Sequence, residues 1–495
     1  MKRFAGLILV FVMLLSALPA LADTTRTSGD FQYTLKSNGT ATIVGYTGSG
    51  DSIIIPQMLD GYTVTAIGDS AFNKSNEIRE ENCSVTLPDT IKSIGKFAFR
   101  NMNITSINLP DGLEDIGKGA FVGCNSITYR ISANHPTFAV IDGALYNKSQ
   151  KKLIWGKEGA TIPEGIKIIG DFACYEVPNC GINRNGIVLP SSIEEIGDYA
   201  FYGNHYSIAF SGGMSETEFI KPVPKSNYPC FSSFPYFSRL TPCELKWDSN
   251  LQKIGSCAFA SVTIDYNNSD AILILSIPSS VSELGEACFN SFGISSSSMR
   301  YLSPWTWRGV AISIPKDSQL RSIPARAFAN FEGSQKTPLC SIICDAPIVT
   351  IGDYAFGGTY IASFNMQNVK TLGKGAFYST IQGASITIPD GCKIIPEKAF
   401  ENAYTMGYEI VIPNGVEVIE ANAFNLKKIF SPYVSPDDFS PIRLPASLTS
   451  IAPDAFRDDA EFIVERGSYA YRWAEENARN YSIDGEKQNL DWLNN

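Results

Sequence analysis

A recurring fifteen-residue pattern constrains the fold of this chain more than any other feature. Regular copies carry proline at the fourth position and end at Phe99, Phe121, Phe201, Phe289, Phe400, Phe424 and Phe456. Less regular copies end at Phe72, Cys174, Phe259, Phe328, Phe356 and Phe377, and from Phe356 to Phe424 the steps are 21, 23 and 24 residues. Such a period predicts a coil of stacked turns, here called rungs, in which each rung covers the apolar side of its neighbour.

Each copy begins like a half-buried strand. In ITIP, residues 386–389, Ile386 and Ile388 alternate with Thr387, and Pro389 ends the strand because proline has no amide donor. The outward positions are mostly small and polar, which suits either a partner-binding face or a merely solvated one. These positions are Thr86, Asn108, Thr161, Val188, Lys246, Ser276, Ser313, Asp345, Asn365, Thr387, Val411 and Arg443.

Glycine and proline share one site of the pattern, which limits the backbone conformation there. Gly95 in IKSIGKFAF corresponds to Pro396 in CKIIPEKAF, and Glu420 and Ala452 occupy the same site in two other copies. Proline fixes φ near about −65°, so the site does not need the positive φ that favours glycine. We expect the first position of a short helical or 3-10 turn, with Phe400 plugging the interior and the glycines marking crowding or loose selection.

These patterns predict a β-rich solenoid: a right-handed leucine-rich-repeat coil with a parallel strand ladder on one face and short helical or 3-10 turns on the other. The coil covers residues 53–461, and insertions interrupt it near residues 125–158, 202–244 and 290–311. A β cap over 23–52, which contains a Ser-Asn-Gly hairpin turn, is expected before it.

A helical cap over 462–495 is expected after the coil. Ser468 is a plausible N-cap residue. An apolar stripe suited to covering the last rung consists of Ala470, Trp473, Ala474 and Ala478.

The first 22 residues predict a secretory signal peptide. Lys2 and Arg3 precede an apolar run from Leu7 to Leu15, and Ala20-Leu21-Ala22 is a small-x-small cleavage site. An uncleaved anchor is the alternative, but the run is shorter than the ~20 residues that span a bilayer. We therefore expect a secreted or cell-surface protein without a transmembrane segment after cleavage. The net charge of −10 argues against nucleic acid or an anionic membrane surface as partner.

The positions of the eleven cysteines favour buried, inert thiols over a redox or metal-binding role. Cys174 stands at the position of the repeat phenylalanine, Cys288 at that of its alanine, and Cys392 at that of an aliphatic. Possible disulfides are Cys340/Cys344, Cys174/Cys180 and Cys230/Cys243, and no zinc-like CxxC pairs occur. We expect no metal and no cofactor.

No catalytic signature stands out. The two histidines, His135 and His205, lie beside insertions and are expected to be ordinary surface residues. A GxSxG elbow, an EF-hand loop and a P-loop are all missing from the sequence. Scattered carboxylates are explained by turns and N-caps. The sequence predicts a protein that is not an enzyme, although a hydrolase with an unrecognised site remains an alternative.

Two insertions are dense in aromatic residues, which are enriched at binding hot spots. The residues predicted to bind a partner are Tyr228, Phe231, Phe234, Tyr236, Phe237, Tyr301, Trp305 and Trp307. The competing interpretation is that these side chains fold back over the coil as local mini-cores.

The pattern IxLPxxIxxIGxxAF, together with SGDFQYTLKSNGTATIVGYTG and IDGALYNKSQKKLIWG, resembles the BspA-like leucine-rich repeats of bacterial surface proteins. The resemblance covers nearly all of the chain after the signal peptide. It implies an exported protein that mediates adhesion to host or matrix proteins or to other cells, without shared catalytic residues. Unlike many relatives, the sequence shows no recognisable wall anchor. We expect a non-catalytic module that binds a protein or glycan; a structural or decoy surface protein without a specific ligand is the alternative.

Overall fold

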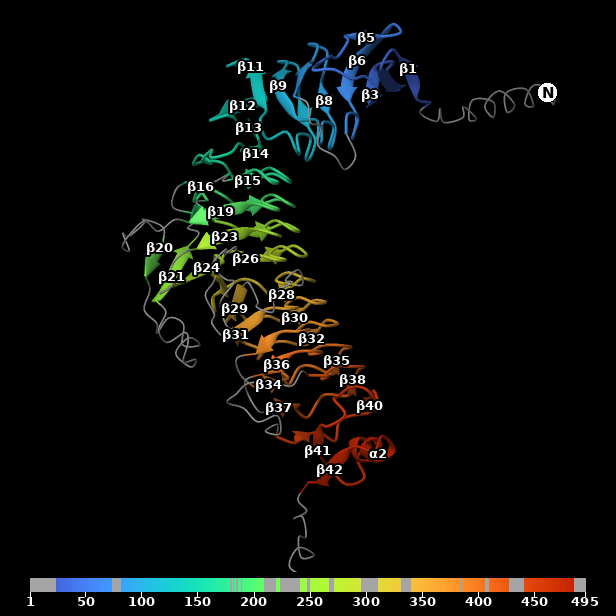
Figure 1. Ribbon diagram of the computed structural model, residues 1–495, viewed down its shortest axis with the longest axis vertical. Helices are drawn as coiled ribbons and strands as arrows, with labels where there is room; N and C mark the ends of the chain where they lie inside the picture. Colours follow the sequence, from blue (N-terminus) through green and yellow to red (C-terminus); the bar gives the residue numbers. More distant parts are fainter. Residues whose placement is uncertain are drawn as a thin grey trace, which may run out of the picture. The chain divides into compact units, whose positions relative to one another are not determined.

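The chain is rich in short β-strands (Figure 1). The computed structural model describes residues 24–73, 82–178, 180, 182–183, 186–187, 189–208, 220–222, 241–246, 250–266, 271–294, 310–330, 340–382, 385–405, 409–426 and 440–484. The chain divides into two compact units, Met1–Lys148 and Ser149–Asn495, and each is described by itself.

In the first unit, antiparallel strands lead into parallel ones. The first sheet is ordered β1 (Arg26–Ser28), β2 (Phe31–Leu35), β3 (Ala41–Tyr46), β6 (Tyr62–Ile67), β8 (Ser93–Ile94) and β10 (Asp115–Ile116), with β5 (Met58–Leu59) also paired to β6. From β3 onwards this order is parallel. A second, parallel sheet is ordered β4 (Ser52–Ile54), β7 (Cys83–Thr86), β9 (Ile104–Leu109) and β11 (Thr128–Ile131). A hairpin of β12 (Phe138–Ile141) and β13 (Ala144–Asn147) follows.

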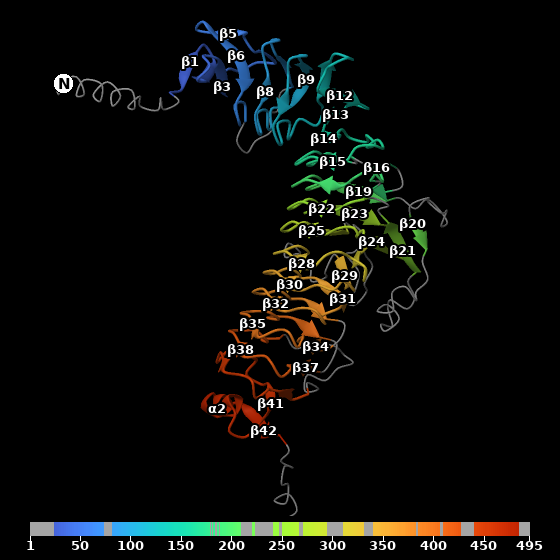
Figure 2. The same ribbon diagram turned by 180° about the vertical axis from the view of Figure 1, so that it is seen from behind.

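In the second unit, most rungs contribute strands to two parallel rows, which Figures 1 and 2 show from opposite sides. The strands that begin the rungs form the main ladder: β21 (Thr241–Lys246), β24 (Ala271–Ser276), β27 (Val310–Ile314), β29 (Cys340–Cys344), β31 (Tyr360–Phe364), β33 (Ile381–Gln382) and β36 (Tyr404–Thr405), then β34 (Ile386–Thr387) with β37 (Ile410–Val411), then β39 (Ile442–Arg443), β41 (Glu461–Val464) and β42 (Asn480–Ile483). At the start of this ladder, β20 (Ile220–Pro222) pairs antiparallel with β21.

The second row, called the short ladder, consists mainly of two-residue strands that directly precede the glycine site. They are β14 (Lys152–Trp155), β15 (Ile168–Ile169), β18 (Glu195–Ile196), β22 (Lys253–Ile254) and β25 (Glu283–Leu284), then β28 (Ser322–Ile323), β30 (Thr350–Ile351) and β32 (Thr371–Leu372), then β35 (Ile394–Ile395), β38 (Val418–Ile419) and β40 (Ser450–Ile451). The remaining strands are β16 (Ile182–Asn183), β17 (Gly186–Ile187), β19 (His205–Ile208), β23 (Thr263–Tyr266) and β26 (Gly293–Ile294). The sequence interpretation expected aliphatic residues at this part of the rung to face the core but did not predict a second ladder.

The predicted alternation along the strands holds at the regular rungs. Ile386 and Ile388 are buried while Thr387 between them is exposed. At β27 the expected outward polar row is wrong, because Ser313 is only 6% exposed. Its neighbours on the same strand face, Ala311 and Ile343, are apolar and buried as well. An apolar strand face requires cover, so this part of the ladder is not an open surface.

The turn after the glycine site is not helical, and the prediction of a helical or 3-10 turn was wrong. Gly95 itself needs no positive φ, but the residue two positions later adopts one: φ is 52° at Phe97 and 64° at Lys398. The amide of Phe97 donates to the carbonyl oxygen of Lys118 in the next rung at 3.1 Å. A left-handed residue whose amide donates to a neighbouring rung cannot continue a helix, so the segment is a tight turn bonded between rungs.

Crowding explains the frequent glycine at the shared site, as expected. A Cβ atom added to Gly117 would lie 2.6 Å from the backbone nitrogen of Lys96 in the preceding rung, and one added to Gly285 would lie 2.2 Å from that of Ser256. Carboxylates beside the glycine also connect rungs. The Ser256 amide donates to the Asp198 side chain at 2.8 Å, and the Asp198 amide donates to that of Asp171 at 2.9 Å.

The repeat phenylalanines point inward, as predicted, and in the second unit they form one continuous stack. Their ring centroids are 5.1–5.6 Å apart at Phe201, Phe259, Phe289, Phe328, Phe356, Phe377, Phe400, Phe424 and Phe456. Trp473 and Phe462 meet the last ring, Phe456, edge-on. The interior of each rung therefore depends on the rung beside it.

The C-terminal helix α2 (Tyr469–Glu476) begins where the sequence indicated. Ser468 accepts a hydrogen bond from the Tyr471 amide at 3.0 Å, and Ala470, Trp473 and Ala474 are buried. Ala478 is not part of this stripe, because the helix has already ended and Ala478 is exposed with φ 51°.

His135 is buried, contrary to the expectation of a surface residue. It is 0% exposed, and its Nε2 atom lies 2.9 Å from the carbonyl oxygen of Pro110. Its Nδ1 atom accepts hydrogen bonds from the amides of Thr137 and Phe138, both at 3.1 Å. Since Nδ1 accepts, Nε2 carries the proton and donates to Pro110. His135 thus satisfies two backbone amides of its own segment and the carbonyl of Pro110 in an earlier rung.

Most described cysteines are structural. Cys174 and Cys180 form a disulfide, while Cys344 is a free buried thiol, so the predicted Cys340/Cys344 bridge does not form. Cys230 lies outside the described residues, which leaves the Cys230/Cys243 pair a prediction. Burial raises the pKa of Cys124 to about 11 and that of Cys344 to about 12, so both stay protonated and unreactive near neutral pH.

Candidate binding pocket

The structure does not test the prediction that aromatic residues of two insertions bind a partner. They lie outside the described residues: Tyr228, Phe231, Phe234, Tyr236, Phe237, Tyr301, Trp305 and Trp307. Within the described residues, the clearest departure from the repeat lies at β31 of the second unit.

A β-bulge shifts the register of β31 against β29. The irregularity falls between Ile342 and Ile343, and after it Phe364 lies opposite the buried Cys344. Phe364 therefore occupies an inward position, where its ring meets those of Phe356 and Phe377 edge-on at 5.2 and 5.9 Å.

The sequence of this rung explains the shift. Aligned on the closing phenylalanine, Ser363 and Asn365 correspond to Ile386 and Ile388 of the next rung. In the regular register these two polar side chains would enter the apolar interior. Moving the register by one residue exchanges the two faces of a strand, so Phe364 turns inward and Ser363 and Asn365 become half-exposed.

One side of β34 has no strand partner among the described residues. The amides of Ile386 and Ile388 donate to the carbonyl oxygens of Glu409 and Val411, at 3.1 and 2.9 Å, on the side of β37. Successive peptide groups of a strand point to opposite sides, so the amide and carbonyl of Thr387 face away from β37. In the described part of the chain, β34 pairs with β37 alone.

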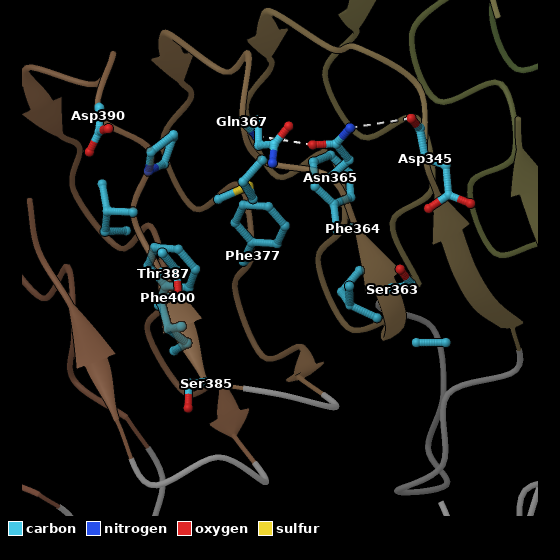
Figure 3. A pocket seen from close by; sticks show the side chains of 16 residues that line it. Asp345, Ser363, Phe364, Asn365, Gln367, Phe377, Ser385, Thr387, Asp390 and Phe400 are labelled. Carbon is cyan, nitrogen blue, oxygen red and sulfur yellow. Dashed lines mark hydrogen bonds between the residues drawn. The ribbon is translucent and has the colours of Figure 1, made fainter. Parts of the chain in front are cut away.

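A pocket of about 690 Å³ lies at this interruption (Figure 3). Its apolar lining consists of Phe364 and aliphatic residues of β31 and β34, together with Phe377 and Phe400, which are each only 1% exposed. Its polar lining residues are Asp345, Ser363, Asn365, Gln367, Ser385, Thr387 and Asp390. A hollow of this size, lined by both polar and apolar groups, is a candidate binding site.

The polar edge of the pocket is held in place by hydrogen bonds. The Asn365 amide donates to the carbonyl oxygen of Cys344 at 2.7 Å, and its side-chain oxygen accepts from the Gln367 amide at 3.1 Å. The side-chain nitrogen of Asn365 donates to the Asp345 carbonyl oxygen at 3.4 Å. Figure 3 shows Asn365 and Gln367 between Asp345 and Asp390, which stand at opposite ends of the site.

The pocket is acidic. Asp345 and Asp390 supply two carboxylates, and the described lining residues include no lysine, arginine or histidine. Partial burial raises the pKa of Asp345, and the charge of Lys316 opposes that rise. Both residues are exposed, and an acidic site without a lining cation is a favourable place for a positively charged group of a partner.

The site offers no evident catalytic chemistry. Its two carboxylates stand apart at either end, and no histidine, cysteine or lysine is among the described lining residues. Across the described residues, no group of three His, Cys, Asp or Glu side chains is placed to hold a metal ion.

Among the residues that the structure describes, no helix is long and apolar enough to cross a membrane.

Sequence reasoning missed this pocket, although a signal was present. The rung ending at Phe377 reads SFNMQNVKTLGKGAF, in which the usual aliphatic pair and the proline are replaced by serine, asparagine and methionine. The sequence analysis places Asn365 among the outward positions, and it does lie at the polar edge of the pocket. The inward turn of Phe364 was not predicted, because Ala362 in β31 is an extra residue without a partner in β29, and it shifts the register of the residues after it.

Comparisons with known proteins identify the same type of repeat as the sequence pattern does. A family model described as BspA type leucine rich repeat region, with six copies, matches residues 46–157, 230–304 and 307–431. Among solved structures, the chain is similar to a leucine rich cell surface protein from Faecalibacterium prausnitzii, with 18% identity and TM-score 0.35 over 95% of this chain and 97% of that one. It is also similar to a leucine-rich repeat protein from Bacteroides ovatus, with 17% identity and TM-score 0.36 over 92% and 99%. No curated protein matches the chain. The matched repeats cover more than half of the sequence, and the chain belongs to the family of BspA-type leucine-rich-repeat proteins.

Proposed function

We propose that this protein is an exported, non-catalytic binding or adhesion module that recognises a protein partner. The observation that carries the proposal is the pocket beside β34, where a rigid strand ladder leaves backbone groups and an apolar hollow open together. Leucine-rich repeats of this kind serve as interaction modules, and binding sites are commonly built from irregular positions on a rigid scaffold. A glycan partner is the second candidate from the family resemblance, and the pocket favours protein.

Export is part of the same proposal. It is supported by the charged and apolar pattern of the first 22 residues and by the Cys174–Cys180 disulfide, a bond that persists in oxidising compartments. The right-handed sense of the coil and the capping roles of residues 23–52 and 462–495 also belong to the proposal. They are supported by the antiparallel start of the first sheet and by Trp473 against the last phenylalanine.

The aromatic insertions remain a second predicted contact region. Replacing Trp305 and Trp307 with serine is expected to weaken partner binding if these side chains touch the partner. Unchanged binding to every identified partner would contradict that contact and favour the mini-core interpretation.

A binding experiment tests the proposed function. The chain from Asp23 onwards would be immobilised and exposed to purified host-matrix proteins and to a glycan array. We expect saturable binding of at least one protein, reduced at least tenfold by Ser363→Trp, which fills the pocket. Ser322→Trp is the matched control, because Ser322 is exposed on the short ladder. Binding of glycans alone, of no component, or of a protein with equal affinity to wild type and Ser363→Trp would contradict the proposal.

A further inference from the structure

We infer that the pocket between β31 and β34 receives an arginine or lysine side chain from an extended segment of the partner protein, whose backbone lies along the open side of β34. This inference rests on the proposed function and names the part of a partner that the site takes. Three features of the pocket lead to it: an open strand edge, two carboxylates and an apolar part of the lining.

The open edge favours an extended backbone. The amide and carbonyl of Thr387 face away from β37, and in the described residues no strand pairs with them. Backbone groups at a strand edge are satisfied by adding another strand, which is the recurring way in which sheets bind peptides. A partner segment in this position gains main-chain hydrogen bonds that depend little on its sequence.

The carboxylates favour a cation. Asp345 and Asp390 are contributed by rungs on either side of the one that carries Phe364, and no described lining residue neutralises them. Lys316 is close enough to oppose the raised pKa of Asp345 but does not line the pocket. An acidic or neutral side chain would leave both carboxylates without a counter-charge, whereas a guanidinium or ammonium group would supply a counter-charge at the carboxylate that it approaches.

The interior suits the stem of a long basic side chain. Phe364 and Met366 belong to the apolar lining, and long basic residues bury their methylene groups against such surfaces while the charged end stays near polar groups. A sugar is a poorer fit, because stacking needs a free aromatic face. The faces of Phe377 and Phe400 cover each other, with centroids 5.1 Å apart and planes 6° from parallel, and Phe364 meets Phe377 edge-on.

Short peptides test the inference without knowledge of the natural partner. The probes are fluorescently labelled Ac-Thr-Val-Arg-Val-Thr-NH₂ and its counterparts with norleucine or glutamate in place of arginine. Anisotropy would be followed with the full chain after Asp23, at two salt concentrations. We expect the arginine peptide to bind about tenfold more tightly than the norleucine peptide, with the difference shrinking at high salt.

Two variants locate the effect. Asp345→Asn combined with Asp390→Asn is expected to remove the preference for arginine, while Asp317→Asn, which removes an exposed carboxylate outside the pocket, is expected to leave it unchanged. Hydrogen exchange at the Thr387 amide should slow when the arginine peptide is bound. No binding by any peptide, equal binding of arginine and norleucine peptides, or an unchanged preference in the double variant would overturn the inference. If matrix proteins still bind in those cases, the proposed function stands and only this mode of docking fails.

Discussion

The rings of Phe400 and Phe424 lie parallel, with their centroids 5.5 Å apart and their planes 1° from each other. Both side chains are almost fully buried, with 1% and 2% of their surfaces exposed. Each ring is therefore covered by the rungs on either side of it. Removing one ring takes packing from two neighbouring rungs as well as from its own.

Replacing Phe400 with alanine is expected to lower the free energy of unfolding by about 3–5 kcal/mol, because truncation of a buried aromatic side chain loses its burial and leaves a cavity. Chemical denaturation followed by circular dichroism would measure the change. Ile394→Ala is the control: Ile394 is 51% exposed, and its loss should change stability by less than about 1 kcal/mol. A denaturation curve of Phe400→Ala that coincides with that of the wild type would show the ring assignment to be wrong.

Replacing His135 with alanine is expected to cost roughly 2–4 kcal/mol, because the amides of Thr137 and Phe138 and the carbonyl of Pro110 would lose their partner while buried or partly buried. Hydrogen exchange of the two amides would report the local effect, and denaturation the global one. Asn134→Ala, at an exposed neighbouring residue, serves as the comparison. Equal protection of both amides in His135→Ala and wild type would contradict the role given to His135.

Asp198 is expected to stabilise the chain through its acceptor oxygen more than through its charge. Its carboxylate accepts the Ser256 amide of the next rung at 2.8 Å. Asp198→Ala should cost about 1–2 kcal/mol, as for a lost N-cap acceptor, whereas Asp198→Asn keeps an acceptor and should cost less than half as much. The unfolding midpoints of the two variants measure the difference. Equal losses would indicate that charge, not the hydrogen bond, matters at this turn.

The buried thiols predict a loss of stability at alkaline pH. Burial raises the pKa of Cys124 and of Cys392 from 9.0 to about 11. Between these values the unfolded chain loses thiol protons that the folded chain keeps, so stability is full below about pH 9 and falls as the pH rises to about 11. Each thiol contributes roughly 2 kcal/mol to this fall.

The measurement is the denaturant midpoint at pH 8 and pH 10.5. Because tyrosines also titrate in this range, the wild type is compared with the variant carrying Cys124→Ala and Cys392→Ala. The variant is expected to lose less stability between the two pH values, whatever its stability at pH 8. Parallel declines would mean that these thiols ionise equally easily in the folded and unfolded chains.

Much of the fold was predictable because the repeat encodes it locally. The alternation of apolar and polar residues at Ile386, Thr387 and Ile388 predicts a strand and its inward face. The fixed place of Phe400 in the pattern predicts that its ring lies in the interior. The turn was mispredicted because the sequence shows which residues share the Pro396 site but not where its neighbours' amides donate. The left-handed φ at Lys398 depends on a hydrogen bond to the next rung, at Ala421, which no single rung reveals.

The pocket was less predictable for a related reason. Ser363 and Asn365 signal that the rung departs from the pattern, but the outcome depends on how β31 pairs with Ile342 and Ile343 of the preceding rung, where Ala362 is left without a partner. His135 was misjudged in the same way: its burial follows from three backbone groups that fold around it. In both cases pairing between distant segments overrides the local pattern.

The Phe364 pocket has a consequence for how such chains can diversify. Its described lining comes from three successive rungs, from Asp345 to Phe400, and each rung of a solenoid contacts only its neighbours. Duplication or deletion of a whole rung beyond Phe424 would move the pocket relative to the C-terminal helix by one strand spacing, about 4.8 Å, and leave its geometry intact. The number of rungs thus sets the distance between the pocket and the C-terminal helix, and that distance can change while the pocket keeps its residues.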